Sequence, residues 1–189
     1  MTPRVTPTQP VFYYDLGNPE CYLVAERIMA ELAVVPEWEP VLGSTLGVVT
    51  AESDRDAIGR RVRELGLQPL RWPTAWPPDS ELAMLVATYA KRVGRAVAFS
   101  LAAFRQAFAG GRDLGDEGTV LIAAAACEMH PTAVLKSVGM RSVRLGLQSA
   151  GGRARTAGAR SLPAIQVGDV LFEGEQAIEQ ADALLGARR

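Results

Sequence analysis

The stretch that decides the fold runs from Phe12 to Leu23 and reads FYYDLGNPECYL. It opens on three aromatic residues, which are typical of a buried strand, and a polar, glycine-containing turn from Asp15 to Asn18 ends that run. From Pro19 onward, apolar residues recur at three- and four-residue steps, the period of an amphipathic helix. Asn18 suits the N-cap position and Pro19 suits the first helical turn. The stretch therefore predicts a strand, a tight turn and a helix.

Strands are also predicted further along the chain. Trp38 to Leu42 is the next expected strand, and Pro40 inside it favours an edge or a bulge. Near the C-terminus, 164–167 and 170–172 read as a hairpin around the two-residue turn Gly168-Asp169. A closing amphipathic helix is expected from Glu175 to Leu185.

The middle of the chain has helical periodicity and caps, with no strand pattern. The helices expected here are 53–65, 80–93 with Ser80 as its cap, 96–109, 116–128, 131–138 and 142–156. The whole order is strand-helix-strand, a block of helices, then strand-strand-helix. It predicts an α/β fold with one mixed sheet, helices on both faces and an all-helical insertion at about 53–156. We expect residues 1–10 to be a flexible tail and residues 11–189 to form a single domain.

The composition excludes several classes of function. The chain has 189 residues, of which 48% are hydrophobic and 22% charged, with a formal net charge of −1. This balance predicts no broad attraction to nucleic acid or to anionic membranes. No apolar run approaches the roughly 20 residues that a membrane span needs. Arginines at 55, 60, 61 and 63 read as a solvated helix face, because acidic residues balance them.

The cysteine pattern bears on redox chemistry and metals. Cys21 and Cys127 are the two cysteines, and they form neither a CxxC pair nor a metal-ligand cluster. We therefore expect no metal and a reduced, cytoplasmic location.

Three local motifs, in this order, resemble the DsbA-like thioredoxin-fold superfamily, in particular 2-hydroxychromene-2-carboxylate isomerases and kappa-class glutathione transferases. They are the strand-turn-helix opening at 12–23, the segment 158–165 (GARSLPAI) and the segment 171–176 (LFEGEQ). The resemblance implies a thioredoxin-like fold and a cis-proline at Pro163. It also implies glutathione as cofactor and a small unsaturated or aromatic molecule as substrate.

The resemblance also assigns the expected site residues, with departures. The family's catalytic Ser, or the first Cys of CxxC, aligns with Asn18, and the second Cys aligns with Cys21. Leu162 and Pro163 would dock the glutathione backbone. Glu175 and Gln176 would meet its γ-glutamyl end, although the family has an Asp where this chain has Gln176.

The chemistry of these residues leaves alternatives open. The Asn18 amide could donate a hydrogen bond to a thiolate, or Asn18 could be an ordinary N-cap without a catalytic role. Cys21, one turn into the helix, could have a lowered pKa, or it could be a small buried side chain. Trp72 and Trp76 lie in a proline-rich loop, where they would either wall an aromatic substrate pocket or pin the loop to the insertion.

Three functions follow from these readings. The first is a glutathione-dependent isomerase or transferase that uses Asn18. The second is a degenerate, non-catalytic thioredoxin-fold binding protein, with a homodimer as one arrangement open to it. The third is a DsbA-type thiol oxidoreductase that relies on Cys21 alone.

Overall fold

The computed structural model describes residues 9–47 and 55–187 of the chain. Four strands form one mixed sheet in the order β2-β1-β3-β4. They are β1 (Val11–Tyr14), β2 (Glu37–Pro40), β3 (Ala164–Val167) and β4 (Val170–Glu173). β1 pairs with β2 in parallel and with β3 antiparallel, and β3 and β4 form an antiparallel hairpin. Pro40 therefore lies in an edge strand, as its inability to donate a backbone hydrogen bond predicts.

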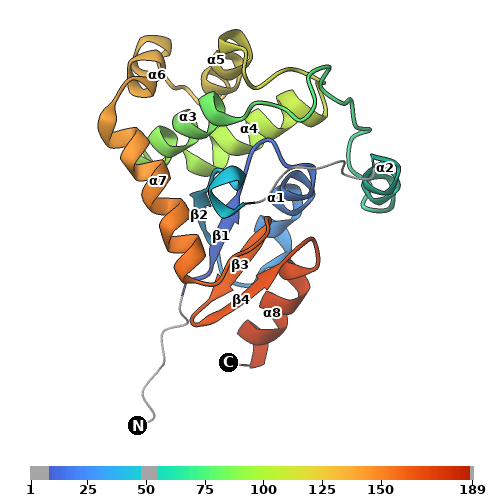
Figure 1. Cartoon of the computed structure of the whole chain (residues 1–189). Coiled ribbons are helices and arrows are strands. Elements are labelled where there is room, and N and C mark those ends of the chain that lie inside the picture. The colour runs from blue at the N-terminus through green and yellow to red at the C-terminus, as the bar shows by residue number, and fades with distance from the viewer. Residues whose placement is uncertain (1–8, 48–54, 188–189) are drawn as a thin grey trace.

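Helices surround this sheet as the sequence predicts (Figure 1). α1 connects β1 to β2, α2 to α7 lie between β2 and β3 in the chain, and α8 follows β4. Figure 1 shows α3 to α6 gathered beyond one end of the sheet, while α7 runs down beside it. The helices are α1 (Pro19–Glu31), the short 3₁₀ helix η1 (Gly43–Leu46), α2 (Arg55–Glu64), α3 (Glu81–Arg92), α4 (Ala96–Phe108), α5 (Glu117–Ala125), α6 (Pro131–Val138), α7 (Arg141–Thr156) and α8 (Ala177–Ala187).

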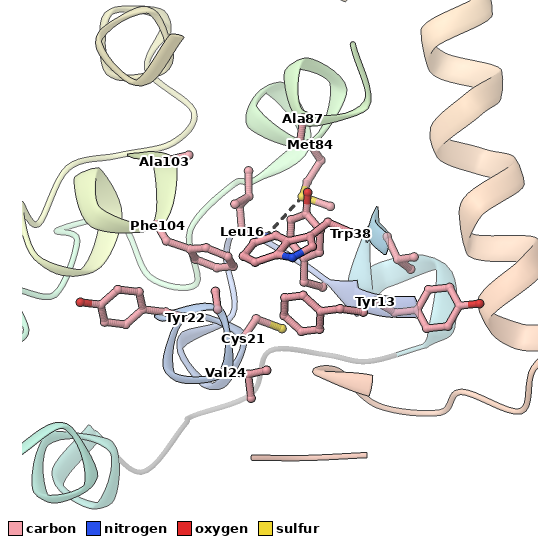
Figure 2. Packing of buried hydrophobic residues seen from close by; sticks show 14 of the residues in the cluster. Tyr13, Leu16, Cys21, Tyr22, Val24, Trp38, Met84, Ala87, Ala103 and Phe104 are labelled. Carbon is pink, nitrogen blue, oxygen red and sulfur yellow. Dashed lines mark hydrogen bonds between the residues drawn. The ribbon is translucent and has the colours of Figure 1, made fainter. Parts of the chain in front are cut away.

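The two faces of the sheet differ in chemistry because side chains alternate along each strand. One face carries Phe12, Tyr14 and Trp38, whose rings are in contact, with Phe12 and Trp38 centroids 5.0 Å apart and Tyr14 and Trp38 centroids 5.4 Å apart. The opposite face carries Tyr13 and Glu39, which are register partners on β1 and β2. Figure 2 shows Tyr13 directed away from the cluster that contains Trp38 and Phe104. The aromatic face forms the core.

Three details of the helices differ from the sequence prediction. α5 ends at Ala125, three residues before the expected end at 128. The closing helix begins at Ala177, because Gly174 adopts a left-handed φ of 81° and turns the chain before the helix can start. Glu175 therefore lies in a turn. Ser80 occupies the N-cap position of α3 but its side chain does not cap it; the Asp79 carboxylate instead accepts from the Glu81 amide at 3.0 Å. The expected helix start at 53–54 lies outside the described residues.

No helix in the described part of the chain is both long and apolar enough to span a lipid bilayer.

Candidate functional site

A buried carboxylate fixes the turn between β1 and α1. Asp15 is only 8% exposed. Its carboxylate accepts hydrogen bonds from the Gly17 amide at 2.8 Å, from the Gly43 amide at 2.7 Å and from the Ser80 hydroxyl. Burial raises the pKa of the Asp15 carboxyl, although these three donors oppose that shift. The turn is thereby tied to the end of β2 and to the start of α3.

Asn18 lies at the N-terminus of α1, where the structure brings it against the Pro163 segment. Its Oδ1 accepts from the Glu20 amide at 2.8 Å and the Cys21 amide at 3.2 Å, so it is a true N-cap. Its Nδ2 donates to the Leu162 carbonyl oxygen at 3.0 Å, and the Leu162–Pro163 bond is cis. An amide nitrogen carries two hydrogens. Asn18 therefore keeps one N–H for another acceptor.

The backbone just before Pro163 is also held by Glu173, the last residue of β4. One Glu173 oxygen, Oε1, accepts from the backbone amides of Arg160 at 2.7 Å and Ser161 at 2.6 Å. Leu162 itself is 3% exposed, and its carbonyl is already engaged by Asn18. The backbone surface that Leu162 could offer to a peptide-like ligand is correspondingly small.

Cys21 is buried in the core, so of the two alternatives the small buried side chain describes it and the lowered thiol pKa does not. The side chain has no exposed surface. Burial raises its pKa well above the ordinary value, and the nearby Asp15 and Glu20 carboxylates raise it further. Figure 2 shows the Cys21 sulfur directed toward core side chains, on the side of α1 away from the Tyr22 ring. Because the thiolate is the reactive form of cysteine, this environment argues against a redox role for Cys21.

We expect the thiols of the folded protein to resist a chromogenic disulfide reagent at mildly alkaline pH. Cys127 is also buried, and burial raises its pKa as well. Both thiols should react only when denaturant is added, which absorbance of the released chromophore measures. Rapid labelling of Cys21 in the native protein, identified by mass spectrometry, would contradict the burial argument.

A pocket of about 510 Å³ opens beside the N-terminal turn of α1. Glu20 of α1 forms one wall, Arg60 and Arg61 of α2 form another, and the turn between β4 and α8 closes the third side with Glu175 and Gln176. Glu175 and Gln176, to which the family resemblance gives a cofactor-binding role, thus lie around a cavity that begins two residues from Asn18.

Within this pocket, Glu175 is already paired by arginines. Its Oε1 is 3.0 Å from Nη1 of Arg27 and 2.5 Å from Nε of Arg61. Arg27 also binds Glu31 at 2.8 Å and Glu179 at 2.6 Å. Glu175 therefore fixes α2 against α1 and α8. Gln176, in contrast, is exposed on the rim of the pocket.

Trp72 and Trp76 pack against each other. Their centroids are 5.0 Å apart at 87°, and Trp72 also contacts Phe108 of α4. The Arg55 guanidinium lies 5.2 Å from the Trp72 ring and 5.0 Å from the Trp76 ring. Trp72 borders a separate pocket of about 450 Å³ on another side of α2. These contacts favour the reading in which both rings pin the loop, with Arg55 as a cation–π partner.

The sequence interpretation missed the arginines. The sequence predicts that Arg55 and Arg61 lie on a solvated helix face, yet Arg55 covers the two tryptophans and Arg61 binds Glu175. One signal was present: Arg61 follows Ile58 by three residues, so both lie on the same side of the helix. Arg27 was also missed, because a single arginine in an apolar helical pattern does not reveal its partners.

The acidic, cysteine and histidine residues do not form a metal centre within the described ranges; no three of them are grouped so as to hold an ion.

The chain is similar to known proteins in its three-dimensional structure. No protein-family model and no curated protein sequence matches the chain. A solved structure of 2-hydroxychromene-2-carboxylate isomerase superposes with a TM-score of 0.82 and 15% identity, covering 94% of each chain.

Two further solved structures are similar. A protein described as a probable DsbA oxidoreductase from Streptomyces coelicolor has a TM-score of 0.77 and 18% identity over 96% of this chain and 89% of its own. The cytosolic disulfide reductase DsbM from Pseudomonas aeruginosa has a TM-score of 0.69 and 14% identity over 95% and 98%, and it has also been solved with GSH. The chain described here therefore has the DsbA-like thioredoxin fold.

Proposed function

We propose that this protein binds glutathione and acts as a glutathione-dependent isomerase or transferase on a small unsaturated or aromatic compound. One observation carries the proposal. At the N-terminus of α1 the chain offers a spare amide N–H, on Asn18, beside a pocket of about 510 Å³, whereas its own nearby thiol, on Cys21, is fully buried. A reacting sulfur at this place must therefore come from a bound molecule.

The charged and polar side chains around the pocket suit a small peptide with charged ends. Glutathione carries two carboxylates and one ammonium group. Arg60 is exposed on the pocket wall and makes no salt bridge to any described residue, so it is available to a carboxylate. The Glu20 carboxylate, on the opposite wall, is available to an ammonium group. Gln176 adds an exposed amide that can both donate and accept.

Bound glutathione would supply a thiolate that adds reversibly to the substrate. The contribution of the chain is electrostatic. The N-terminus of α1 carries the positive end of the helix dipole, and the second Asn18 N–H can donate to a negatively charged sulfur. Gln176 and Arg60 would hold the peptide so that its sulfur reaches Asn18. The cytoplasm, where glutathione is abundant and reduced, is the compartment we propose.

A non-catalytic binding protein is the second candidate, and a specific observation favours it. The Asn18 oxygen already caps the Glu20 and Cys21 amides, the same N–H groups that would otherwise face a thiolate. In that reading Asn18 caps α1 and binds the Leu162 carbonyl, and it has no catalytic role. A thiol oxidoreductase is disfavoured because Cys21 is not part of a CxxC pair and has no exposed surface.

Calorimetric titration with glutathione tests the proposal. The wild-type chain should bind, and Arg60→Gln should weaken binding by about 10-fold or more, the effect of losing a hydrogen bond to a charged group. Arg63→Gln is the matched control, because Arg63 lies on the same helix but does not line this pocket. If the wild-type protein shows no heat of binding, the glutathione proposal is wrong.

A further inference from the structure

A second pocket lies on the polar face of the sheet, beneath α7. Its volume is about 840 Å³, within the roughly 300–1,000 Å³ of small-molecule sites. Tyr13 and Gln166 of the sheet and Arg153 of α7 form its walls, and Asp169 lies at its edge. It shares no lining residue with the pocket beside α1. The Gly168-Asp169 turn is at the opposite end of β3 from Pro163, so the two pockets are separate sites.

The sheet wall presents hydrogen-bond acceptors. The Tyr13 hydroxyl donates a hydrogen bond to Oε1 of Gln166 at 2.7 Å, and Nε2 of Gln166 donates one to the Gly168 carbonyl at 2.8 Å. Burial raises the pKa of the Tyr13 hydroxyl, so it keeps that proton. What Tyr13 offers to a ligand is therefore a lone pair. The exposed Asp169 carboxylate adds a negative charge to the same side.

The helix wall presents a cation that is held in place from behind. The Arg153 side chain is 55% exposed, and its Nη2 is 3.0 Å from Oε1 of Glu39, whose side chain is 9% exposed. Glu39 also binds Nζ of Lys91 at 2.6 Å, so the carboxylate is itself fixed. A guanidinium has five N–H donors. Arg153 thus retains donors for a ligand while Glu39 restricts its orientation.

Gly152 keeps the helix wall open. It lies inside α7 and lines the pocket, and a Cβ atom added there would meet no other atom within 4 Å. Close packing against the protein therefore does not require glycine at this position. Glycine inside a helix is unfavourable by about 1 kcal/mol relative to alanine. Because Gly152 has no side chain and open space beside it, a ligand in the pocket can approach the helix backbone closely at this position.

We infer that this pocket binds a small zwitterion, such as a free amino acid or a short unblocked peptide. The carboxylate of the ligand would bind Arg153. Its ammonium group would lie against Asp169 and the Tyr13 oxygen. A positive group on one wall and acceptors on the other favour a molecule with both charges over a simple anion or a simple cation. This inference does not depend on glutathione binding beside α1.

Calorimetry with triglycine as the probe tests this site. The wild-type chain should bind triglycine at millimolar concentration. N-acetylated triglycine and triglycine amide, which each lack one charge, should bind about 10- to 100-fold more weakly. Gly152→Leu should weaken binding by about 10-fold or more because its side chain occupies the part of the cavity next to Arg153, and it should leave folding intact because leucine favours a helix.

Gly186→Leu is the matched control. Gly186 is also helical, in α8, and a Cβ there also meets no atom within 4 Å, but it lies outside this pocket. Binding should be unchanged in this variant. The inference is overturned if wild-type protein does not bind triglycine, if Gly152→Leu binds as well as wild type, or if the blocked peptides bind equally.

Discussion

Replacing Asn18 by alanine should raise the thiol pKa of bound glutathione by about 1–2 units and slow glutathione-dependent turnover by about 10- to 100-fold. The reason is the loss of a hydrogen bond to a charged sulfur, which contributes about 1.5–3 kcal/mol. The ultraviolet absorbance of the thiolate, followed against pH in the complex, measures the pKa. Turnover of an aromatic electrophile measures the rate.

Two variants control this experiment. Asn18→Ser should keep much of the effect, because a hydroxyl can also donate. Cys21→Ala should leave both readouts unchanged, since the buried Cys21 thiol does not reach the site. In the non-catalytic reading Asn18→Ala would lower only the unfolding free energy, by about 1 kcal/mol for the lost helix cap and about as much again for the lost hydrogen bond to the Leu162 carbonyl. A wild-type thiol pKa in Asn18→Ala would remove Asn18 from the site.

Replacing Arg27 by alanine should lower the free energy of unfolding by about 3 kcal/mol. The Arg27 side chain is 8% exposed and binds Glu31, Glu175 and Glu179 together. Removing it leaves three carboxylates near one another without their shared cation, and the loss of one partner from a buried pair typically costs about 3–5 kcal/mol. The lower end applies because Glu31 and Glu179 are partly solvated. Urea unfolding, monitored by tryptophan fluorescence, gives the free energy.

Arg105→Ala is the comparison for Arg27→Ala. Arg105 also binds a glutamate of α1, Glu26, at 2.7 Å, but its side chain is 54% exposed. Exposed ion pairs contribute about 1 kcal/mol or less. Equal losses in the two variants would show that burial of the Arg27 network contributes nothing.

The fold could be predicted largely from local sequence, because the relevant signals are short-range. Aromatic content marks β1, and the Asn18-Pro19 pair marks the start of α1; both positions agree with the structure. The predicted start of α8 is two residues too early because Glu175 and Gln176 are residue types that favour helices. The left-handed Gly174 before them keeps both in a turn. The sequence predicts Ser80 as the cap of α3, but the Ser80 hydroxyl is hydrogen-bonded to Asp15, 65 positions earlier in the chain.

The candidate site could be predicted only in part, because its contacts join distant segments. Asn18 and Leu162 were assigned to one site through a resemblance, and they are hydrogen-bonded. The burial of Cys21 depends on tertiary packing around α1, which contacts α4 and α8, and no local pattern reports that packing. Glu175, the partner that Arg27 and Arg61 share, lies more than 100 residues from both arginines, in the turn before α8.

The position of β3 in the sheet affects how the chain acquires its structure during synthesis. β1 can pair with β2 soon after both emerge from the ribosome, but its other edge pairs with β3, about 150 residues later. At roughly 5–20 residues per second, that edge waits on the order of ten seconds for its partner. During this interval an apolar strand with unpaired backbone groups is open to other chains. The inserted helices thus set how long the nascent chain carries an unpaired strand edge at β1.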